Sequence, residues 1–356
     1  MATRTARTPA NNAVPPPDSR CFGFPVVGNC SVVGGCWYAR AVAPFGLVTD
    51  FPSSTVHRCN DDAVRRDIPD RDPCHFSRRR FRARHQYVAE PAVLVERDQH
   101  ILTITLNRPE KRNAFNPEVL CRLADAWDLL DDDPDLRVAI MTGAAGNFSA
   151  GADLDRLVGA LISGEPAQNE YEERVRSDFS LIYKGFLKDH YVRKPIIAAV
   201  EGYCYAGGME ILQAFDIRVA AENAQLAISE VQRGLFPMSA STIRLPRQIP
   251  YTVAMEMLIA GTPISGQRAY EVGLVGHVTA AGGALGRARE IAQQVAANGP
   301  LAVRNIKASV IENLEKTEAE AFPRELELGM AVMASADAKE GPRAFLEKRP
   351  PKFTGT

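Results

Sequence analysis

The chain has 356 residues, of which 46% are hydrophobic and 24% charged, and its formal net charge is −1. This length gives room for one large domain or two ordinary ones with a sizeable core, and the near-neutral charge makes nucleic acid and anionic membranes poor partners. No apolar run reaches the roughly 18 residues of a transmembrane helix, so we expect no membrane span and a cytoplasmic protein.

Residues 1–87 differ in composition from the rest of the chain. They hold five of the seven cysteines, a Pro15-Pro16-Pro17 triplet and a basic cluster at 78–82, without a sustained hydrophobic period. We expect little stable structure there. Two origins stay open for this segment: an organellar transit peptide, although the prolines would break its amphipathic helix, or an over-extended start of translation.

The seven cysteines and six histidines show no spacing typical of metal ligands. The cysteine count is odd and no Cys-x-x-Cys pair occurs, which favours free thiols in a reducing compartment over a zinc module. We therefore expect no metal site.

Strand and helix patterns alternate from residue 93 onward. The expected elements are strands at 93–95 and 101–106, a helix at 117–130, a strand at 138–142, helical structure over 155–193, a strand at 194–200, two short strands before residue 230, and helices at 251–260, 300–314, 318–333 and 338–348. Asn116 and Pro117 mark the N-cap and first position of the first helix. The alternation predicts an α/β fold with largely parallel strands.

A corner of small residues, Gly207-Gly208, follows the strand at 194–200 and opens a short helix. Glycine permits close approach of a ligand, and the free N–H groups at a helix start favour a negative oxygen. Glu210 follows among apolar neighbours, where burial raises the pKa of a carboxyl group, and we expect Glu230 to face it. This pattern indicates acid/base chemistry on a carbonyl compound. The alternative is a plain tight turn with a glutamate that only complements the helix dipole.

Five stretches in this order resemble the crotonase superfamily, also called the enoyl-CoA hydratase/isomerase family. They are LNRPEKRNA at 106–114, FSAGAD at 148–153, KPIIAAV at 194–200, AGGME at 206–210 and ISE at 228–230. The resemblance covers residues 88–356. It implies a crotonase-like α/β spiral of ββα units over 88–285 and a C-terminal helical trimerisation region over 286–356, in a homotrimer or homohexamer.

The resemblance also implies an enoyl-CoA hydratase, a lyase that adds water to a trans-2-enoyl-CoA thioester in fatty-acid or related acyl degradation. Coenzyme A is part of this substrate, and no other cofactor is expected. The N–H groups of Ala152 and Gly207 would form the oxyanion hole, Glu210 would activate the water, and Glu230 would protonate C2. Further substrate contacts are expected at Arg108, Lys111, Ala150, Asp153, Leu154, Gly208 and Phe353, although the basic residues among them are equally well read as solvated surface charge.

Three departures from the family pattern stand out. Ala206 replaces a third glycine that many hydratases have, residues 238–241 replace a frequently glycine-rich turn, and Asp155 stands where relatives commonly carry a lysine. Two other activities stay open: an enoyl-CoA isomerase, in which one glutamate moves a proton between C2 and C4, and a catalytically silent acyl-CoA-binding oligomer. The long helical stretch after Asp155 favours a bulky or long acyl group.

Overall fold

A computed structural model describes residues 90–356 of the chain. The expectation of little structure over residues 1–87 lies outside these residues. No helix within 90–356 is both long and apolar enough to cross a membrane.

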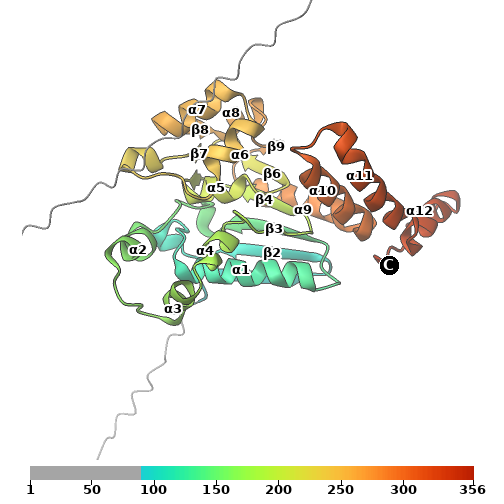
Figure 1. The fold of residues 1–356 in the computed structure, drawn as a ribbon, viewed down its shortest axis with the longest axis horizontal. Coiled ribbons are helices and arrows are strands. Elements are labelled where there is room, and N and C mark those ends of the chain that lie inside the picture. Colours follow the sequence, from blue (N-terminus) through green and yellow to red (C-terminus); the bar gives the residue numbers. More distant parts are fainter. Residues whose placement is uncertain (1–89) are drawn as a thin grey trace, which may run out of the picture. The chain divides into compact units, whose positions relative to one another are not determined.

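Two β-sheets form the centre of the fold (Figure 1). The six strands of the larger sheet follow the order β1 (Val93–Asp98), β2 (Ile101–Leu106), β3 (Val138–Gly143), β4 (Ile196–Val200), β6 (Ile217–Ala221) and β9 (His277–Thr279). Only the β1–β2 hairpin is antiparallel, and the other neighbours run parallel. The smaller sheet joins β5 (Tyr203–Tyr205), β7 (Gln225–Ala227) and β8 (Ile264–Ser265). The predicted α/β class with largely parallel strands is confirmed.

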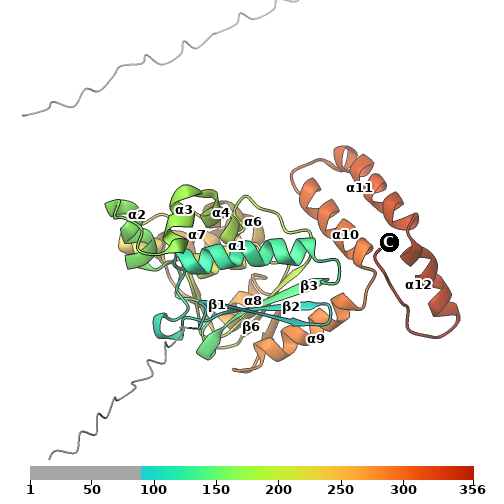
Figure 2. The same ribbon diagram turned by 90° about the horizontal axis from the view of Figure 1, so that it is seen from below.

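The larger sheet is covered on both faces. All five residues of β4, the run IIAAV, are buried, as is typical of a parallel strand between two layers of helices. On one face, α1 (Pro117–Asp132) contributes Leu120, Leu123 and Trp127 to the main apolar cluster. On the other face, α9 (Ala284–Ala296) forms a smaller cluster with the sheet. Figure 2 shows the two helices on opposite sides of the strands.

Local capping explains where the helices begin. The side chain of Asn116 accepts a hydrogen bond from Val119 N at 2.9 Å, and Pro117 is the first helical residue of α1, as predicted. Thr317 and Glu320 form a capping box at the start of α11 (Glu318–Met333). Outside the segment 154–193, the other α-helices are α5 (Gly207–Leu212), α6 (Ser241–Gln248), α7 (Tyr251–Ala260), α8 (Gly266–Glu271), α10 (Pro300–Asn313) and α12 (Ala336–Leu346).

The segment 154–193 is less regular than the helical structure expected there. It contains a π-helical turn (Leu154–Gly159) followed by α2 (Ala160–Ser163), α3 (Glu170–Ser177) and α4 (Ser180–Gly185). The buried carboxylate of Glu172 holds the intervening loop, because it accepts hydrogen bonds from Gln168 N at 2.7 Å and from the side chain of Arg156. Capping by Asn169 and the left-handed Gly164 divide the stretch into short helices.

Helices α10, α11 and α12 form the C-terminal helical region (Figure 1). The boundary expected between residues 285 and 286 falls in the first turn of α9, and Ala284, Ala288 and Ala292 of that helix are buried against the sheet. We therefore propose to draw the boundary before Pro300.

Candidate active site

A cavity of about 950 Å³ lies beside the start of α5. Its wall comes from four parts of the chain: the loop at 111–114, the segment 150–158, helix α4, and the corner 203–210 with the segment 229–239. The residues expected at the site that line this cavity are Lys111, Ala150, Ala152, Asp153, Leu154, Gly207, Glu210 and Glu230. Residues from distant parts of the sequence therefore meet in one wall.

Two backbone N–H groups stand next to each other in this wall. A methyl group added at Gly207 would lie 3.5 Å from the nitrogen of Ala152. Gly207 is the first residue of α5, so its N–H has no partner within the helix. Among the backbone hydrogen bonds of turns, loops and caps in residues 90–356, none is donated by the N–H of Ala152 or of Gly207. Such a pair can bind a developing oxyanion.

Close packing fixes the backbone at this corner. Gly151 has φ +95°, and a methyl group there would lie 2.6 Å from the Cβ of Ala206. Gly208 packs against Ser149, because a methyl group added at Gly208 would lie 3.0 Å from the Ser149 Cβ. Gly208, an expected substrate contact, thus lies behind the cavity wall.

The carboxyl group of Glu210 is buried in the wall, with the residue only 5% exposed. Burial and the charge of Glu230 raise its pKa to about 7. The N–H groups of Ser239 and Ser241 and the Lys188 ammonium act in the opposite direction, and Ser239 N donates to Glu210 Oε1 at 2.6 Å. A carboxyl group with this pKa can accept or release a proton at neutral pH.

Pairing in the smaller sheet brings Glu230 to the same cavity. Strand β5 leads into Glu210 and strand β7 leads towards Glu230, and the two strands pair in parallel with Tyr205 opposite Ala227. Glu230 is buried, and burial raises its pKa. Its Oε2 atom is buried and has no hydrogen-bond partner in the described part of the chain, and Glu230 is one of the residues that line the cavity.

Arg108 and Asp153 form an ion pair that joins two loops of the site. Arg108 Nη2 donates to Asp153 Oδ2 at 3.0 Å, and Arg108 Nη1 donates to the carbonyl oxygen of Ala114 at 2.7 Å. Asp153 also caps the π-helical turn by accepting hydrogen bonds from Asp155 N and Arg156 N. Burial opposes ionisation of Asp153, but these donors hold its pKa below the usual value. Arg108 is absent from the cavity lining.

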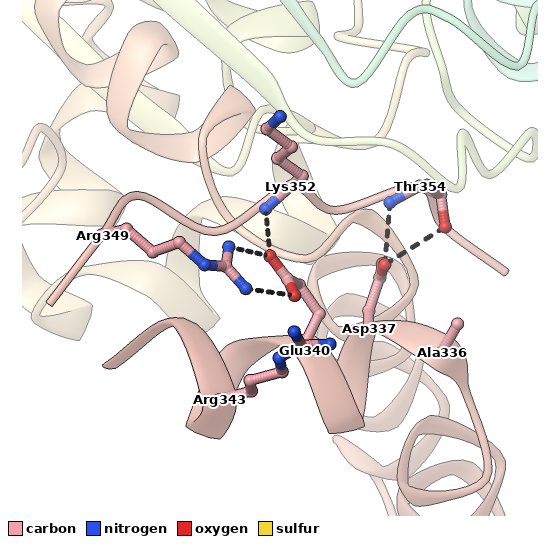
Figure 3. A pocket seen from close by; sticks show the side chains of 7 residues that line it. All are labelled: Ala336, Asp337, Glu340, Arg343, Arg349, Lys352 and Thr354. Carbon is pink, nitrogen blue, oxygen red and sulfur yellow. Dashed lines mark hydrogen bonds and ion pairs between the residues drawn. The ribbon is translucent and has the colours of Figure 1, made fainter. Parts of the chain in front are cut away.

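Phe353 lies in the C-terminal tail, outside the cavity lining of its own chain. A methyl group added at Gly341 of α12 would lie 3.6 Å from the Phe353 ring, and Arg137 Nη2 donates to the Phe353 carbonyl oxygen at 2.8 Å. Two carboxylates on α12 hold this tail (Figure 3): Glu340 binds Arg349 through two hydrogen bonds, and Asp337 accepts one from Thr354 N.

Other lining residues were not predicted as site residues. Ser239 supplies a hydrogen bond to Glu210, and no sequence signal marks it as a site residue. Aromatic side chains form much of the apolar wall: Phe179, Tyr183, Phe186, Tyr203, Tyr205 and Phe236. The density of aromatic residues between 171 and 191 was a usable signal for three of these six.

Comparisons with known proteins show to which family this fold belongs. Residues 96–356 match a family model described as enoyl-CoA hydratase/isomerase. The chain is 46% identical over 263 residues to "Enoyl-CoA hydratase EchA19" of Mycobacterium tuberculosis, a match that covers 74% of this chain and 96% of that protein. It is 36% identical over 265 residues to a carnitinyl-CoA dehydratase of Salmonella, covering 73% of this chain and 97% of the relative.

Solved structures give the same result for the fold. A putative enoyl-CoA hydratase/isomerase from Mycobacterium abscessus matches with a TM-score of 0.67 at 43% identity, covering 74% of this chain and 100% of that one. An enoyl-CoA hydratase from Mycobacterium tuberculosis matches with a TM-score of 0.67 at 41% identity, covering 75% and 100% of the two chains. These matches confirm the resemblance inferred from the sequence, and the chain belongs to the enoyl-CoA hydratase/isomerase family, with the crotonase fold.

Proposed function

We propose that the protein is an enoyl-CoA hydratase, a lyase that adds water across the double bond of a trans-2-enoyl-CoA to give a 3-hydroxyacyl-CoA. The observation that carries the proposal is the presence of two buried glutamates, Glu210 and Glu230, in the cavity wall that also holds the paired N–H groups of Ala152 and Gly207. Similarity to proteins named enoyl-CoA hydratase supports it.

The proposed reaction uses each of these groups once. The N–H groups of Ala152 and Gly207 bind the thioester oxygen as it gains negative charge, which is worth about 3 kcal/mol for each donor. Glu210, with a pKa of about 7, takes a proton from water while the water oxygen bonds to C3. Glu230, which begins the cycle protonated, gives a proton to C2 as the enolate collapses. Transfer of the proton from Glu210 back to Glu230 then restores the starting state. The product has gained one water, and no cofactor beyond the coenzyme A of the substrate takes part.

The cavity wall offers separate places for the two ends of the substrate. Lys111 and Arg112 lie on the loop at 111–114, and we assign them to the coenzyme A phosphates. Ala150, Asp153 and Leu154 belong to the loop that carries Ala152, and we place them along the pantetheine and thioester. Tyr183 of α4 and the flanking residues Phe179 and Phe186 fit a long or bulky apolar acyl group.

The test follows the absorbance of the conjugated enoyl thioester, with crotonyl-CoA and then with longer and bulkier enoyl-CoAs. Glu210→Gln and Glu230→Gln are each expected to slow hydration by about 10²–10⁴-fold. Glu222→Gln, a change at an exposed glutamate, is the matched control and should leave the rate unchanged. Absence of hydration by the wild-type protein with every enoyl-CoA would overturn the proposal.

An isomerase is the second candidate, because Glu230 Oε2 has no protein partner in residues 90–356 and is free to move a proton alone. It predicts that Glu210→Gln keeps the conversion of a 3-enoyl-CoA to a 2-enoyl-CoA. Loss of both activities in this variant would exclude that candidate. If the wild-type protein binds acyl-CoA but converts neither substrate, the remaining interpretation is a catalytically silent acyl-CoA-binding oligomer.

A homotrimer or homohexamer is part of the proposal. Two helices of the C-terminal region carry large apolar side chains that are exposed in the single chain and recur at helical spacing. They are Ile306 and Val310 on α10, Leu314 directly after its last residue, and Phe322, Leu326, Met330 and Met333 on α11. Exposed apolar surface of this kind is typical of a protein interface. We also propose a cytoplasmic location, which the free thiols of Cys121 and Cys204 support.

A further inference from the structure

The turn Ser239–Ser241 lies against the carboxylate of Glu210. Ser239 N donates to Glu210 Oε1 at 2.6 Å, and the N–H of Ser241 also favours the charged carboxylate. The turn's three residues are all buried. The position of this turn therefore decides how well the charged form of Glu210 is stabilised.

The backbone of this turn is in a conformation that its own sequence does not favour. Ala240 has φ 83° and ψ 7°, in the left-handed region where a residue with a Cβ is strained by about 1 kcal/mol or more. Such a conformation persists only where surrounding contacts hold it. A contact outside the turn must therefore supply the constraint.

Gln213 supplies such a contact. It follows Glu210 by three residues at the end of α5, so both side chains lie on the same side of the helix. Gln213 Nε2 donates to Ser241 Oγ at 2.7 Å and to the Met209 carbonyl oxygen at 3.0 Å. Gln213 and Ser241 are 2% and 0% exposed, so water does not compete for this hydrogen bond. Glu210 thus accepts a hydrogen bond from one end of the turn, Ser239, and Gln213 donates one to the other end, Ser241.

Two side chains bind the main chain of Gln213. Its carbonyl oxygen accepts hydrogen bonds from Gln248 Nε2 at 2.9 Å and from Arg218 Nη2 at 3.0 Å. Arg218 also binds Gln248 Oε1 at 3.0 Å, which closes the network. The Gln213 main chain is therefore held by two partly buried side chains that are also hydrogen-bonded to each other.

We propose that Gln213 is a positioning residue that acts through Ser241: it fixes the turn Ser239–Ser241 so that the backbone N–H groups of the turn stabilise the ionised carboxylate of Glu210. The inference rests on the proposed role of Glu210 as the base. Gln213 does not line the cavity and touches no substrate.

The other charged groups around Glu210 act on it directly. Glu230 from the segment after β7 disfavours its ionisation, and Lys188 from the loop after α4 favours it. Arg244 on α6 is a further cation near Glu210 and donates to the Leu187 carbonyl oxygen at 2.7 Å. None of these three is bonded to Gln213 or Ser241, so a change at Gln213 leaves them in place.

The test compares Gln213→Met and Ser241→Ala with the wild type. Methionine has a similar length to glutamine but lacks the donor, and Gln213 Oε1 has no partner to lose within the described residues. Each variant should shift the acid limb of the pH dependence of kcat/KM upward by about 0.5–1 unit, because a carboxylate that loses its donors ionises at higher pH. Activity should fall about three- to tenfold at pH 6 and approach that of the wild type at pH 9.

Three controls separate the possible outcomes. The double variant should shift no further than either single one, because both changes break the same hydrogen bond. Gln293→Met, the same change at an exposed glutamine of α9, should shift nothing. Equal losses at every pH, or additive shifts in the double variant, would overturn the inference and leave Gln213 with a purely structural role.

A second readout does not depend on turnover. In protein with ¹³C-labelled glutamate carboxyl groups, the NMR signal that disappears in Glu210→Gln reports the titration of Glu210. We expect its midpoint, about 7 in the wild type, to move upward in Gln213→Met and in Ser241→Ala. An unchanged midpoint would refute the positioning role of Gln213, whether or not the protein hydrates enoyl-CoA. A shifted midpoint in a protein that does not hydrate enoyl-CoA would refute only the proposed function.

Discussion

Ala206, next to the oxyanion donors, adopts φ 49° and ψ −121°, a backbone conformation that glycine tolerates far better. The departure noted in the sequence, an alanine where many relatives have glycine, is therefore a strained position. Its methyl group also explains why residue 151 must be glycine, since a second methyl there would lie 2.6 Å away.

We expect Ala206→Gly to stabilise the protein by about 1 kcal/mol, because relief of strain exceeds the entropy that glycine adds to the unfolded chain. Urea unfolding measures the change. Ala331→Gly, at an exposed position of α11, is the control and should destabilise by up to about 1 kcal/mol. Destabilisation by Ala206→Gly would show that the methyl group contributes more through packing than it costs in strain.

Glu210 makes stability depend on pH. Its pKa is raised from 4.5 to about 7 in the folded protein, so its folded state favours the protonated form. The stabilisation of the folded protein that comes from protonated Glu210 is fully present below pH 4.5 and is lost as the pH rises towards 7. The Glu210→Gln variant lacks this titration. We therefore expect the free energy of unfolding of the variant minus that of the wild type to be larger by about 3 kcal/mol at pH 8 than at pH 4. Urea unfolding at both pH values, with Glu110→Gln as an exposed control, tests this; a difference that does not depend on pH would contradict it.

At the scale of elements, the sequence predicted best where local signals decide. Asn116 and Pro117 located the start of α1, and the predicted bounds of α7 and α11 agree with the structure, because caps and helical periodicity are local properties. The division of 154–193 was missed, since it depends on Glu172 binding Arg156 across the loop. Sequence reasoning expected Glu230 to face Glu210, and both line one cavity, where the pairing of the short strands β5 and β7 brings them.

The Arg108–Asp153 ion pair shows why a residue type alone does not assign a contact. Sequence reasoning expected Arg108 at the substrate, but a partner 45 residues away holds its guanidinium behind the loop. We predict that Arg108→Met raises KM by disordering the loop that carries Ala152, with a loss of about 3 kcal/mol in stability.

The comparison with Asp153→Asn identifies the cause. If Arg108 acts through Asp153, the two variants should raise KM to a similar degree and the double variant should add little. If Arg108 contacts the coenzyme A phosphates directly, Arg108→Met alone should weaken the dependence of KM on salt, and Asp153→Asn should leave it intact. Steady-state kinetics at two ionic strengths distinguish these outcomes.

At the scale of the whole molecule, the exposed apolar rows on α10 and α11 are the surface that a single chain leaves without cover. We expect light scattering to give the mass of a trimer or hexamer, and Leu314→Glu with Leu326→Glu to lower it towards that of one chain, because a charge in a buried interface lacks a partner. Lys316→Glu, a charge change in the loop between the helices, is the control. A wild-type mass of one chain would contradict the expected oligomer.

The family and the fold class were predicted from ordered motifs, because several motifs in the same order constrain the whole chain. The boundary that we propose before Pro300 depends on tertiary contacts, because it rests on the packing of α9 against β3, β4 and β6. Placement of Phe353 against α12 likewise depends on the tail contacts of Asp337 and Glu340.

The burial of Glu210 also bears on how the rate of the proposed hydration changes with pH. If Glu210 is the base proposed above, a pKa of about 7 means that fewer molecules carry its carboxylate as the pH falls below neutrality. At subsaturating substrate, the proposed hydration would therefore slow down as its surroundings become more acidic. A modest acidification would then lower the rate without any change in the amount of protein.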